Sequence, residues 1–240
     1  MTIRTKEAMT GKVNEFDQPI GEPLDGWEPP PFPSGKGLTG TYVALDPLDG
    51  MTHGPDLAAA FDGAPGSLWT YLPFGPFTDD RELTAAVDGM TGFPDRQPYA
   101  ITVDGVALGF ASYLRIDRPN GVLEVGSIGL APALQRTTAA TEALFLMIDH
   151  AFDLGYRRCE WKCDDLNAPS RAAALRLGFT YEGTFRQATH YKGRNRDTAW
   201  YAIVDHEWPD LRRAFAAWLA PANFDAEGRQ RSTLAELRER

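Results

Sequence analysis

The sequence has few cysteines, no long apolar run and no excess of basic residues. Of its 240 residues two are cysteine, and 24 basic residues stand against 33 acidic ones, a formal net charge of -9. Because such a chain repels phosphate overall, we expect neither nucleic acid nor an anionic membrane as a partner. No apolar run approaches the roughly 20 residues of a membrane span, and the first residues lack the apolar core of a signal sequence. The sequence therefore predicts a cytoplasmic protein without membrane contact.

The scarcity of cysteine and histidine argues against disulfide and metal chemistry. Cys159 and Cys163 share the strand-like run "RRCEWKCDD". On a strand, positions four apart share a face at about 13 Å, whereas a disulfide needs Cα atoms within about 7 Å. The four histidines are scattered along the chain. We therefore expect reduced thiols in or near the core and no metal site.

Glycine and proline are concentrated at the N-terminus and divide the chain into three parts. Residues 1–38 form a Pro/Gly-rich arm without periodicity, residues 39–220 a globular domain, and residues 221–240 a polar tail that we expect to be loosely held. Trp27, Phe32 and Ile20 are costly to leave in water, which favours an arm lying across the core. A mobile tail with one anchoring aromatic is the alternative.

The globular part alternates strand and helix patterns. We expect a single α/β domain around a mixed sheet, in which a hairpin turns at the dipeptide 104–105. The expected strands are 39–49, 99–103, 106–117, 122–130, 156–163, 179–187 and 197–205, and the expected helices are 54–63, 78–92, 138–155, 167–178 and 206–219.

One junction has little glycine where glycine would be informative. The stretch "LAPALQRTTAATEAL" at 130–144 joins a strand to a helix, a place where proteins often bind phosphate. The helix start would offer unpaired N–H groups to an anion. If the backbone keeps negative φ, the hydroxyls of Thr137 and Thr138 add donors and Arg136 adds charge. In the alternative interpretation, Thr137 or Thr138 is only an N-cap.

Two motifs in this order resemble the GNAT N-acetyltransferases. They are "EVGSIGLAPALQRTTAATEAL" and "NAPSRAAALRLGFTYEGTFRQ", and the resemblance spans 39–219. It is closer to the branch that acetylates ribosomal-protein N-termini. The resemblance implies a mixed, mostly antiparallel sheet flanked by helices, acetyl-CoA as co-substrate, and a primary amine as acceptor.

The resemblance also implies how the coenzyme is held. In the family the turn reads Arg or Gln, two residues, Gly, one residue, then Gly or Ala. Gln135 and Ala140 fit, whereas Thr138 stands at the glycine and Arg136 at another position that is commonly glycine. A bulge at the strand end frees N–H groups, and Gly129 suits that bulge or a close backbone approach; an ordinary strand end is the alternative. The implied coenzyme contacts are Ile128, Gly129, Leu130, Gln135, Arg136, Thr137, Thr138, Ala139, Ala140, Thr141, Asn167 and Ser170.

The resemblance implies three catalytic groups. Glu124 stands where the branch carries a carboxylate and would be the base, or else a solvent-facing glutamate paired with an arginine. The Leu130 N–H would donate to the oxyanion. The family's tyrosine acid falls at Ala174, so Ser170 is the substitute, unless it only bonds the backbone near Asn167.

The run "HYKGRNRDTAW" gathers Lys192, Arg194 and Arg196. It is either a solvated hairpin tip or a clamp for an acidic group on the acceptor or the coenzyme.

Together these features predict acetyl transfer from acetyl-CoA to a primary amine, on a small molecule or a protein N-terminus, by direct attack in a ternary complex. The alternative is a coenzyme-binding domain without catalysis, which the missing glycine and tyrosine would favour. A homodimer is left open.

Overall fold

A mixed sheet of eight strands forms the centre of the molecule, and the computed structural model describes residues 12–77 and 79–239. The strand order is β1-β2-β3-β4-β5-β6-β8-β7. Every neighbouring pair is antiparallel except β5 and β6. The strands are β1 (Leu38–Thr39), β2 (Ala44–Pro47), β3 (Gln97–Val103), β4 (Val106–Asp117), β5 (Val122–Leu130), β6 (Arg158–Asp164), β7 (Thr180–Tyr191) and β8 (Arg194–Val204).

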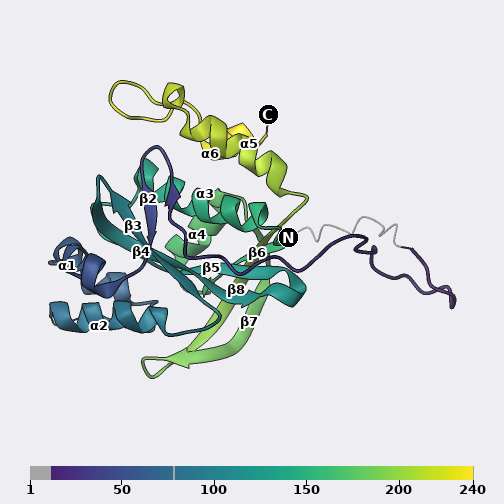
Figure 1. Cartoon of the computed structure of the whole chain (residues 1–240), viewed down its shortest axis with the longest axis horizontal. Helices are drawn as coiled ribbons and strands as arrows, with labels where there is room; N and C mark the ends of the chain where they lie inside the picture. The colour runs from purple at the N-terminus through teal and green to yellow at the C-terminus, as the bar shows by residue number, and fades with distance from the viewer. Residues whose placement is uncertain (1–11, 78, 240) are drawn as a thin grey trace.

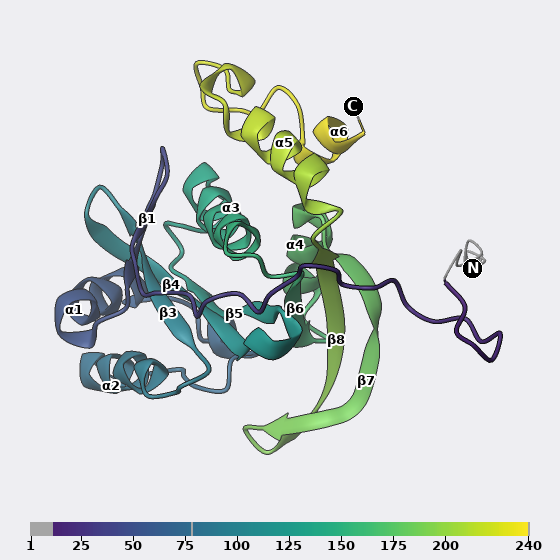
Figure 2. The same cartoon turned by 45° about the vertical axis from the view of Figure 1, so that its right-hand side comes forward.

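Helices cover both faces of the sheet, as Figures 1 and 2 show. One face packs against α1 and α2 in an aromatic-rich cluster, and the other packs against α3, α4 and α5 in the larger core. This order of strands and helices confirms the predicted fold. The helices are α1 (Gly50–Phe61), α2 (Asp80–Thr91), α3 (Thr138–Asp153), α4 (Ala168–Leu177), α5 (Trp208–Leu219) and α6 (Leu234–Arg238), with short 3₁₀ turns η1 (Gly66–Trp69), η2 (Arg118–Asn120) and η3 (Pro221–Asn223).

Two hairpin turns differ in how well the sequence predicts them. Asp104 and Gly105 turn the β3–β4 hairpin with φ of 50° and 81°, as expected for this dipeptide. In the β7–β8 hairpin the turn is only Lys192 and Gly193, with φ of 49° and 69°. Both strands are therefore longer than predicted, because polar residues on an exposed hairpin do not mark a strand end.

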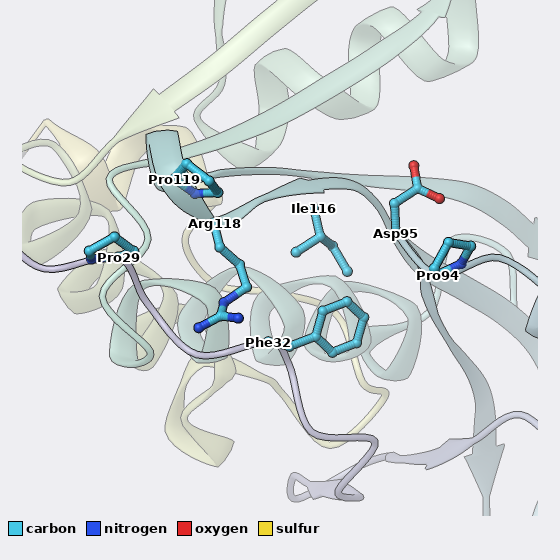
Figure 3. Close-up of a pocket in the computed structure, with 7 residues that line it drawn as sticks. All are labelled: Pro29, Phe32, Pro94, Asp95, Ile116, Arg118 and Pro119. Atoms are coloured by element: carbon cyan, nitrogen blue, oxygen red, sulfur yellow. The ribbon is translucent and has the colours of Figure 1, made fainter.

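Part of the N-terminal arm lies across the domain. Trp27 packs against the guanidinium of Arg157, 5.3 Å from the ring centroid. The Pro30 carbonyl accepts a hydrogen bond from Arg118 Nε at 2.8 Å. Figure 3 shows Phe32 of the arm beneath Ile116, in a groove at the end of β4. The predicted contact between arm and core is confirmed from Trp27 onward.

The first part of the arm behaves differently from the segment that packs on the domain. Residues 12–26 extend away from the body in both overall views, and Ile20 is 43% exposed. The arm was predicted to begin at residue 1, but residues 1–11 lie outside the described residues.

The C-terminal tail is not loosely held, which corrects the expectation. Leu234 is 2% exposed and joins the main core. Gln230 Oε1 accepts a hydrogen bond from Trp218 Nε1 at 2.8 Å, and Arg238 donates to the Leu175 carbonyl at 3.2 Å. Leu234, the partly buried Phe224 and Leu237, and a few directed hydrogen bonds anchor a segment whose polar composition hid them.

β6 carries apolar side chains on one face and charged side chains on the other. Cys159 and Cys163 are free thiols buried in the core beneath the helices, which agrees with their predicted place. Glu160 and Lys162 point to the opposite face and are also buried. Within residues 12–77 and 79–239, no helix has both the length and the apolar character that a membrane crossing would require.

Candidate active site

β5 separates from its parallel partner β6 partway along its length. Pairing with β6 covers only 122–124 of β5. On the β4 side, one extra β5 residue lies between Gly126 and Gly129, so Ser127 and Ile128 form a bulge, with Ser127 at φ 50°. A bulge bends its strand and increases its twist. A gap between the ends of β5 and β6 results, as the resemblance implied.

Of the two roles predicted for Gly129, a place in the bulge or a close backbone approach, the geometry fits the second. It lies just after the bulge, opposite Phe110 on β4. A Cβ at Gly129 would lie 2.3 Å from the Phe110 ring. Glycine is needed here because an aromatic ring packs directly on the backbone, whereas the positive φ of the bulge falls on Ser127.

The Leu130 N–H points toward the gap. The next residue, Ala131, donates its N–H to the Leu108 carbonyl on β4 at 2.9 Å. Because successive residues of an extended strand direct their N–H groups to opposite edges, the Leu130 N–H lies on the edge away from β4. The Leu130 carbonyl lies on that edge too and accepts from Gln135 Nε2 at 2.9 Å.

The turn before α3 keeps a glycine-like backbone without glycine. Arg136 is exposed and has φ 61°, in the left-handed region that L side chains disfavour. The sequence-based prediction assumed negative φ throughout this turn, and that assumption is wrong at Arg136. Thr137 has φ -96° and is the N-cap of α3, accepting from the Ala140 N–H at 3.1 Å and donating to the Leu134 carbonyl at 2.7 Å. Thr137 is thus an N-cap whose hydroxyl is already engaged within the turn, and phosphate binding by the turn stays a prediction.

The same turn leaves several N–H groups without a partner. The N–H groups of Arg136, Thr137, Thr138 and Ala139 donate to no acceptor in the part of the chain that the structure describes. They lie at the positive end of the α3 dipole. This arrangement suits a phosphate or pyrophosphate group.

The last two residues of the predicted phosphate turn are already engaged. The Ala140 N–H bonds the Thr137 hydroxyl, as described above. The Thr141 hydroxyl is buried and accepts from Arg176 at 3.2 Å. The available donors therefore lie at 136–139.

Glu142, in the "TEAL" part of the motif, has a role that the sequence reasoning missed. Its Oε1 and Oε2 accept from the N–H groups of Thr41 and Tyr42 at 2.8 and 2.5 Å. A Cβ at Gly40 would lie 2.4 Å from the Glu142 carboxylate carbon. Glu142 thus anchors the second turn of α3 to the β1–β2 loop.

Glu124 is buried at the point where β5 and β6 part. It is 3% exposed, and its Oε2 lies 2.9 Å from Arg115 and 3.3 Å from Lys162. Burial raises the pKa of Glu124. The positive charges of Arg115 and Lys162 lower that pKa, the negative charge of Glu160 raises it, and the net result is a raised pKa. Oε2 has these ionic neighbours but no well-directed hydrogen bond. The expectation of a solvent-facing glutamate is therefore wrong, although the pairing with an arginine is present.

The Glu124 carboxylate also extends along β5 toward the bulge. A Cβ at Gly126 would lie 2.8 Å from Glu124 Oε1. Glycine therefore leaves space beside this oxygen, next to the start of the gap. The sequence did not identify Arg115 and Lys162 as partners of Glu124. Alternation in "CEWKC" places Glu160 and Lys162 on one face of the strand, but it does not reveal that this face is buried.

The start of α4 lies on the other side of the gap. Asn167 is the N-cap of α4, and its Oδ1 accepts from the Ser170 N–H at 3.2 Å. The Ser170 hydroxyl accepts from Trp161 Nε1 at 3.0 Å. Burial raises the pKa of the Cys163 thiol, and a hydrogen bond with Ser170 lowers it. Ala174, where the family's tyrosine would stand, is fully buried.

The β7–β8 turn is tied to the loop after η1. Lys192 Nζ donates to the carbonyls of Trp69 and Phe74 at 2.7 and 2.9 Å, and Arg194 donates to the Thr70 carbonyl at 2.9 Å. Both cations are exposed, as expected of a solvated hairpin tip, and their bonds to carbonyls also fix that tip against the loop after η1. The clamp for an acidic group stays a prediction. Trp69 is 4% exposed and packs in the aromatic-rich cluster beneath α1 and α2.

No group of three metal-ligating side chains occurs in residues 12–77 and 79–239. What the site presents instead is a buried carboxylate, a strand edge with a free N–H, and a helix start with further free N–H groups, all along β5 and its exit.

Comparison with known proteins extends this picture. Residues 67–179 match the model of the acetyltransferase (GNAT) family. A GCN5-related N-acetyltransferase from Brucella melitensis has a TM-score of 0.87 and 44% identity, covering 90% of this chain and 100% of that one. An acetyl transferase from Salmonella typhimurium, which modifies the N-terminal serine of 50S ribosomal subunit protein L7/L12, has a TM-score of 0.62 and 25% identity, covering 70% of this chain and 99% of that one.

A relative known by its sequence agrees with these structures. The uncharacterised N-acetyltransferase p20 of Bacillus licheniformis is 27% identical over 144 residues, which are 58% of this chain and 80% of p20.

Proposed function

The chain belongs to the GNAT family and is an N-acetyltransferase, and we propose that it transfers an acetyl group from acetyl-CoA to a primary amine by direct attack in a ternary complex. The observation that carries the mechanism is the position of Glu124, buried where β5 and β6 part. The acceptor is a small-molecule amine or a protein N-terminus, the second by analogy with the Salmonella relative.

The residues present fit a coenzyme with a pyrophosphate. The N–H groups at 136–139 have no acceptor among the described residues and lie at the start of α3, so they would hold the phosphates. Asn167 would contact the pantetheine arm from α4, on the opposite side of the gap. Acetyl-CoA, when bound, supplies the activated acetyl group as a thioester.

Glu124 would take the proton that the amine must lose. A free α-amine has a pKa near 8 and a lysine amine near 10.4. A carboxylate with an open lone pair can accept a proton directly or through one water. Oε2 of Glu124 lacks a well-directed hydrogen bond, and Oε1 lies beside Gly126 at the entrance of the gap.

Two further groups would act on the thioester. The Leu130 N–H lies on the gap edge of β5, beyond the last residue paired with β6, and would donate to the carbonyl oxygen as negative charge develops, an effect often worth about 3 kcal/mol. Ser170 would donate to the departing sulfur. Ser170 lies in the first turn of α4, and the hydrogen bond from Trp161 of β6 fixes the position of its hydroxyl.

A panel of amines tests the proposal. Free thiol released from acetyl-CoA is measured with small primary amines, with lysine derivatives and with peptides that begin with serine, all with the full chain. Thiol release with at least one acceptor, and acetylated product by mass, is expected. If no acceptor in the panel turns over and calorimetry detects no acetyl-CoA binding, the proposed mechanism is wrong for this chain.

A further inference from the structure

Lys162 is a buried lysine next to the proposed base. Its side chain is 2% exposed on β6. Its ammonium lies 2.6 Å from Glu160 Oε2, 3.3 Å from Glu124 Oε2 and 3.7 Å from the centroid of the Trp200 ring. An isolated buried ammonium would lose its proton, because burial disfavours charge. Two carboxylates and an aromatic face surround this one and offset the cost of burying its charge.

The same lysine belongs to a run of alternating charges. Beyond Glu160 the run continues to Arg158, whose Nε lies 2.8 Å from Glu160 Oε1, and then to Glu182 on β7. The inner end is Glu124 and the outer end, Glu182, reaches solvent. Glu160 is therefore shared between two cations, which leaves part of the Lys162 charge for Glu124.

Arg115 is the other cation at Glu124, and it differs from Lys162 in exposure. Its side chain is 56% exposed, so water and salt screen its charge although it is closer to Oε2. The Lys162 charge is almost free of that screening. The charged groups with the largest influence on Glu124 are Arg115 of β4 and Lys162 and Glu160 of β6, whereas Trp200 of β8 is neutral.

We propose that Lys162 is a positioning residue of the acetyl-transfer site, which keeps the Glu124 carboxylate ionised and directed toward the gap, and that Glu160 tunes how strongly it does so. This inference rests on the proposed role of Glu124 as the base. It predicts that neighbouring substitutions on β6 move the titration of Glu124 in opposite directions, which a merely structural role would not produce.

The signs follow from the charges. Lys162→Met removes a cation and keeps the length of the side chain. The protonated form of Glu124 is then favoured over the carboxylate, so the titration of Glu124 moves to higher pH by about one unit or more. Glu160→Gln removes an anion and frees the lysine charge for Glu124, so the titration moves to lower pH. Lys192→Met is the matched control, since that ammonium donates to the carbonyls of Trp69 and Phe74 and no ion pair among the described residues joins it to Glu124.

The test measures Glu124 in the free protein by carbon NMR of labelled glutamate carboxyls, with Glu124→Gln assigning the signal. Opposite shifts in Lys162→Met and Glu160→Gln, with no shift in Lys192→Met, support the proposal. Unchanged titration in both β6 variants, or shifts of the same sign, overturn it. If Lys162→Met does not fold, as judged by circular dichroism, Glu160→Gln decides alone: a downward shift supports the proposal, and no shift or an upward one overturns it.

The acid limb of kcat/KM should follow the same shifts, measured with an acceptor amine of low pKa that stays neutral over the range. An upward shift of one unit lowers kcat/KM about tenfold at a pH below the limb. The two hypotheses fail differently. A fully active Glu124→Gln removes Glu124 as the base and leaves the titration result standing, whereas an inactive Glu124→Gln with unmoved titrations removes only the role of Lys162.

Discussion

The two ends of β5 carry different kinds of functional groups. Around Glu124 the groups are side chains from β4, β5 and β6, buried except for Arg115 and held by ion pairs of 2.6 to 3.3 Å. At the exit, the turn at 136–139 offers backbone N–H groups at the surface. A backbone donor survives a change of side chain, and so the turn tolerates arginine and threonine where the family has glycine. The buried end depends on particular charges that no other residue type would replace.

The largest expected effect lies at the buried end. Glu124→Gln keeps the shape but removes the proton acceptor, so kcat should fall by roughly 10²-fold or more at neutral pH, with little change in acetyl-CoA affinity. The loss should shrink at high pH, where the amine is already neutral. Steady-state kinetics between neutral and alkaline pH, with calorimetry for the coenzyme, measures both quantities.

The charge neighbourhood complicates this variant in a way that can be controlled. Glutamine leaves Lys162 with Glu160 as its only carboxylate, so folding should be verified by thermal melting. A variant with wild-type kcat on its best acceptor would remove Glu124 from the mechanism and would erase the functional contrast between the two ends of β5.

Much of the fold was predictable, because it follows from local patterns. Alternation located β5 and β6, the Asp104-Gly105 dipeptide located a hairpin, and the order of elements gave the mixed sheet. The C-terminal tail was not predictable, since its few apolar residues are scattered in a polar segment and Leu234 joins a core whose other members are distant in the chain.

The site divides in the same way. The turn was found because its residues are contiguous, and Glu124 was placed by resemblance. The pairing of Glu124 with Arg115 and Lys162 joins three strands. Strand alternation states which face a side chain occupies but not whether that face is covered, and so a buried charge cluster looks like a solvated one. The left-handed backbone at Arg136 was also missed, because an arginine gives no local signal for positive φ.

A smaller effect is expected at the exposed end. Arg136 is exposed and has no ion pair within the described residues, so its charge is available to a pyrophosphate. A hydrogen bond to a charged partner contributes on the order of 1.5–3 kcal/mol. Arg136→Ala should therefore weaken coenzyme A binding by roughly tenfold or more in calorimetry.

The control ligand for this prediction is dephosphorylated pantetheine, which has no pyrophosphate and should lose less affinity. If Arg136→Ala binds coenzyme A as tightly as the wild type, the side chain contributes nothing, and the N–H groups of the turn hold the phosphates alone. That result would sharpen the contrast between a backbone site and a side-chain site.

The smallest expected effect concerns the strain at the same position. Arg136 has φ 61°, a conformation that costs an L residue about 1–2 kcal/mol and glycine almost nothing. Arg136→Gly should therefore be more stable than Arg136→Ala by about 1 kcal/mol, since part of the gain is offset by the greater freedom of glycine in the unfolded chain. For a chain of this size that difference raises Tm by about 2–4 °C.

Thr138→Gly is the matched control: Thr138 begins α3 with helical backbone, so glycine there relieves no strain and should leave Tm unchanged or lower. The double variant Arg136→Gly with Thr138→Gly should bind coenzyme A at least as tightly as Arg136→Ala, if close backbone approach is what the phosphates need. Equal Tm values for the glycine and alanine variants at 136 would mean that the turn relaxes to negative φ once the arginine is removed, and that the left-handed backbone belongs to the side chain rather than to the turn.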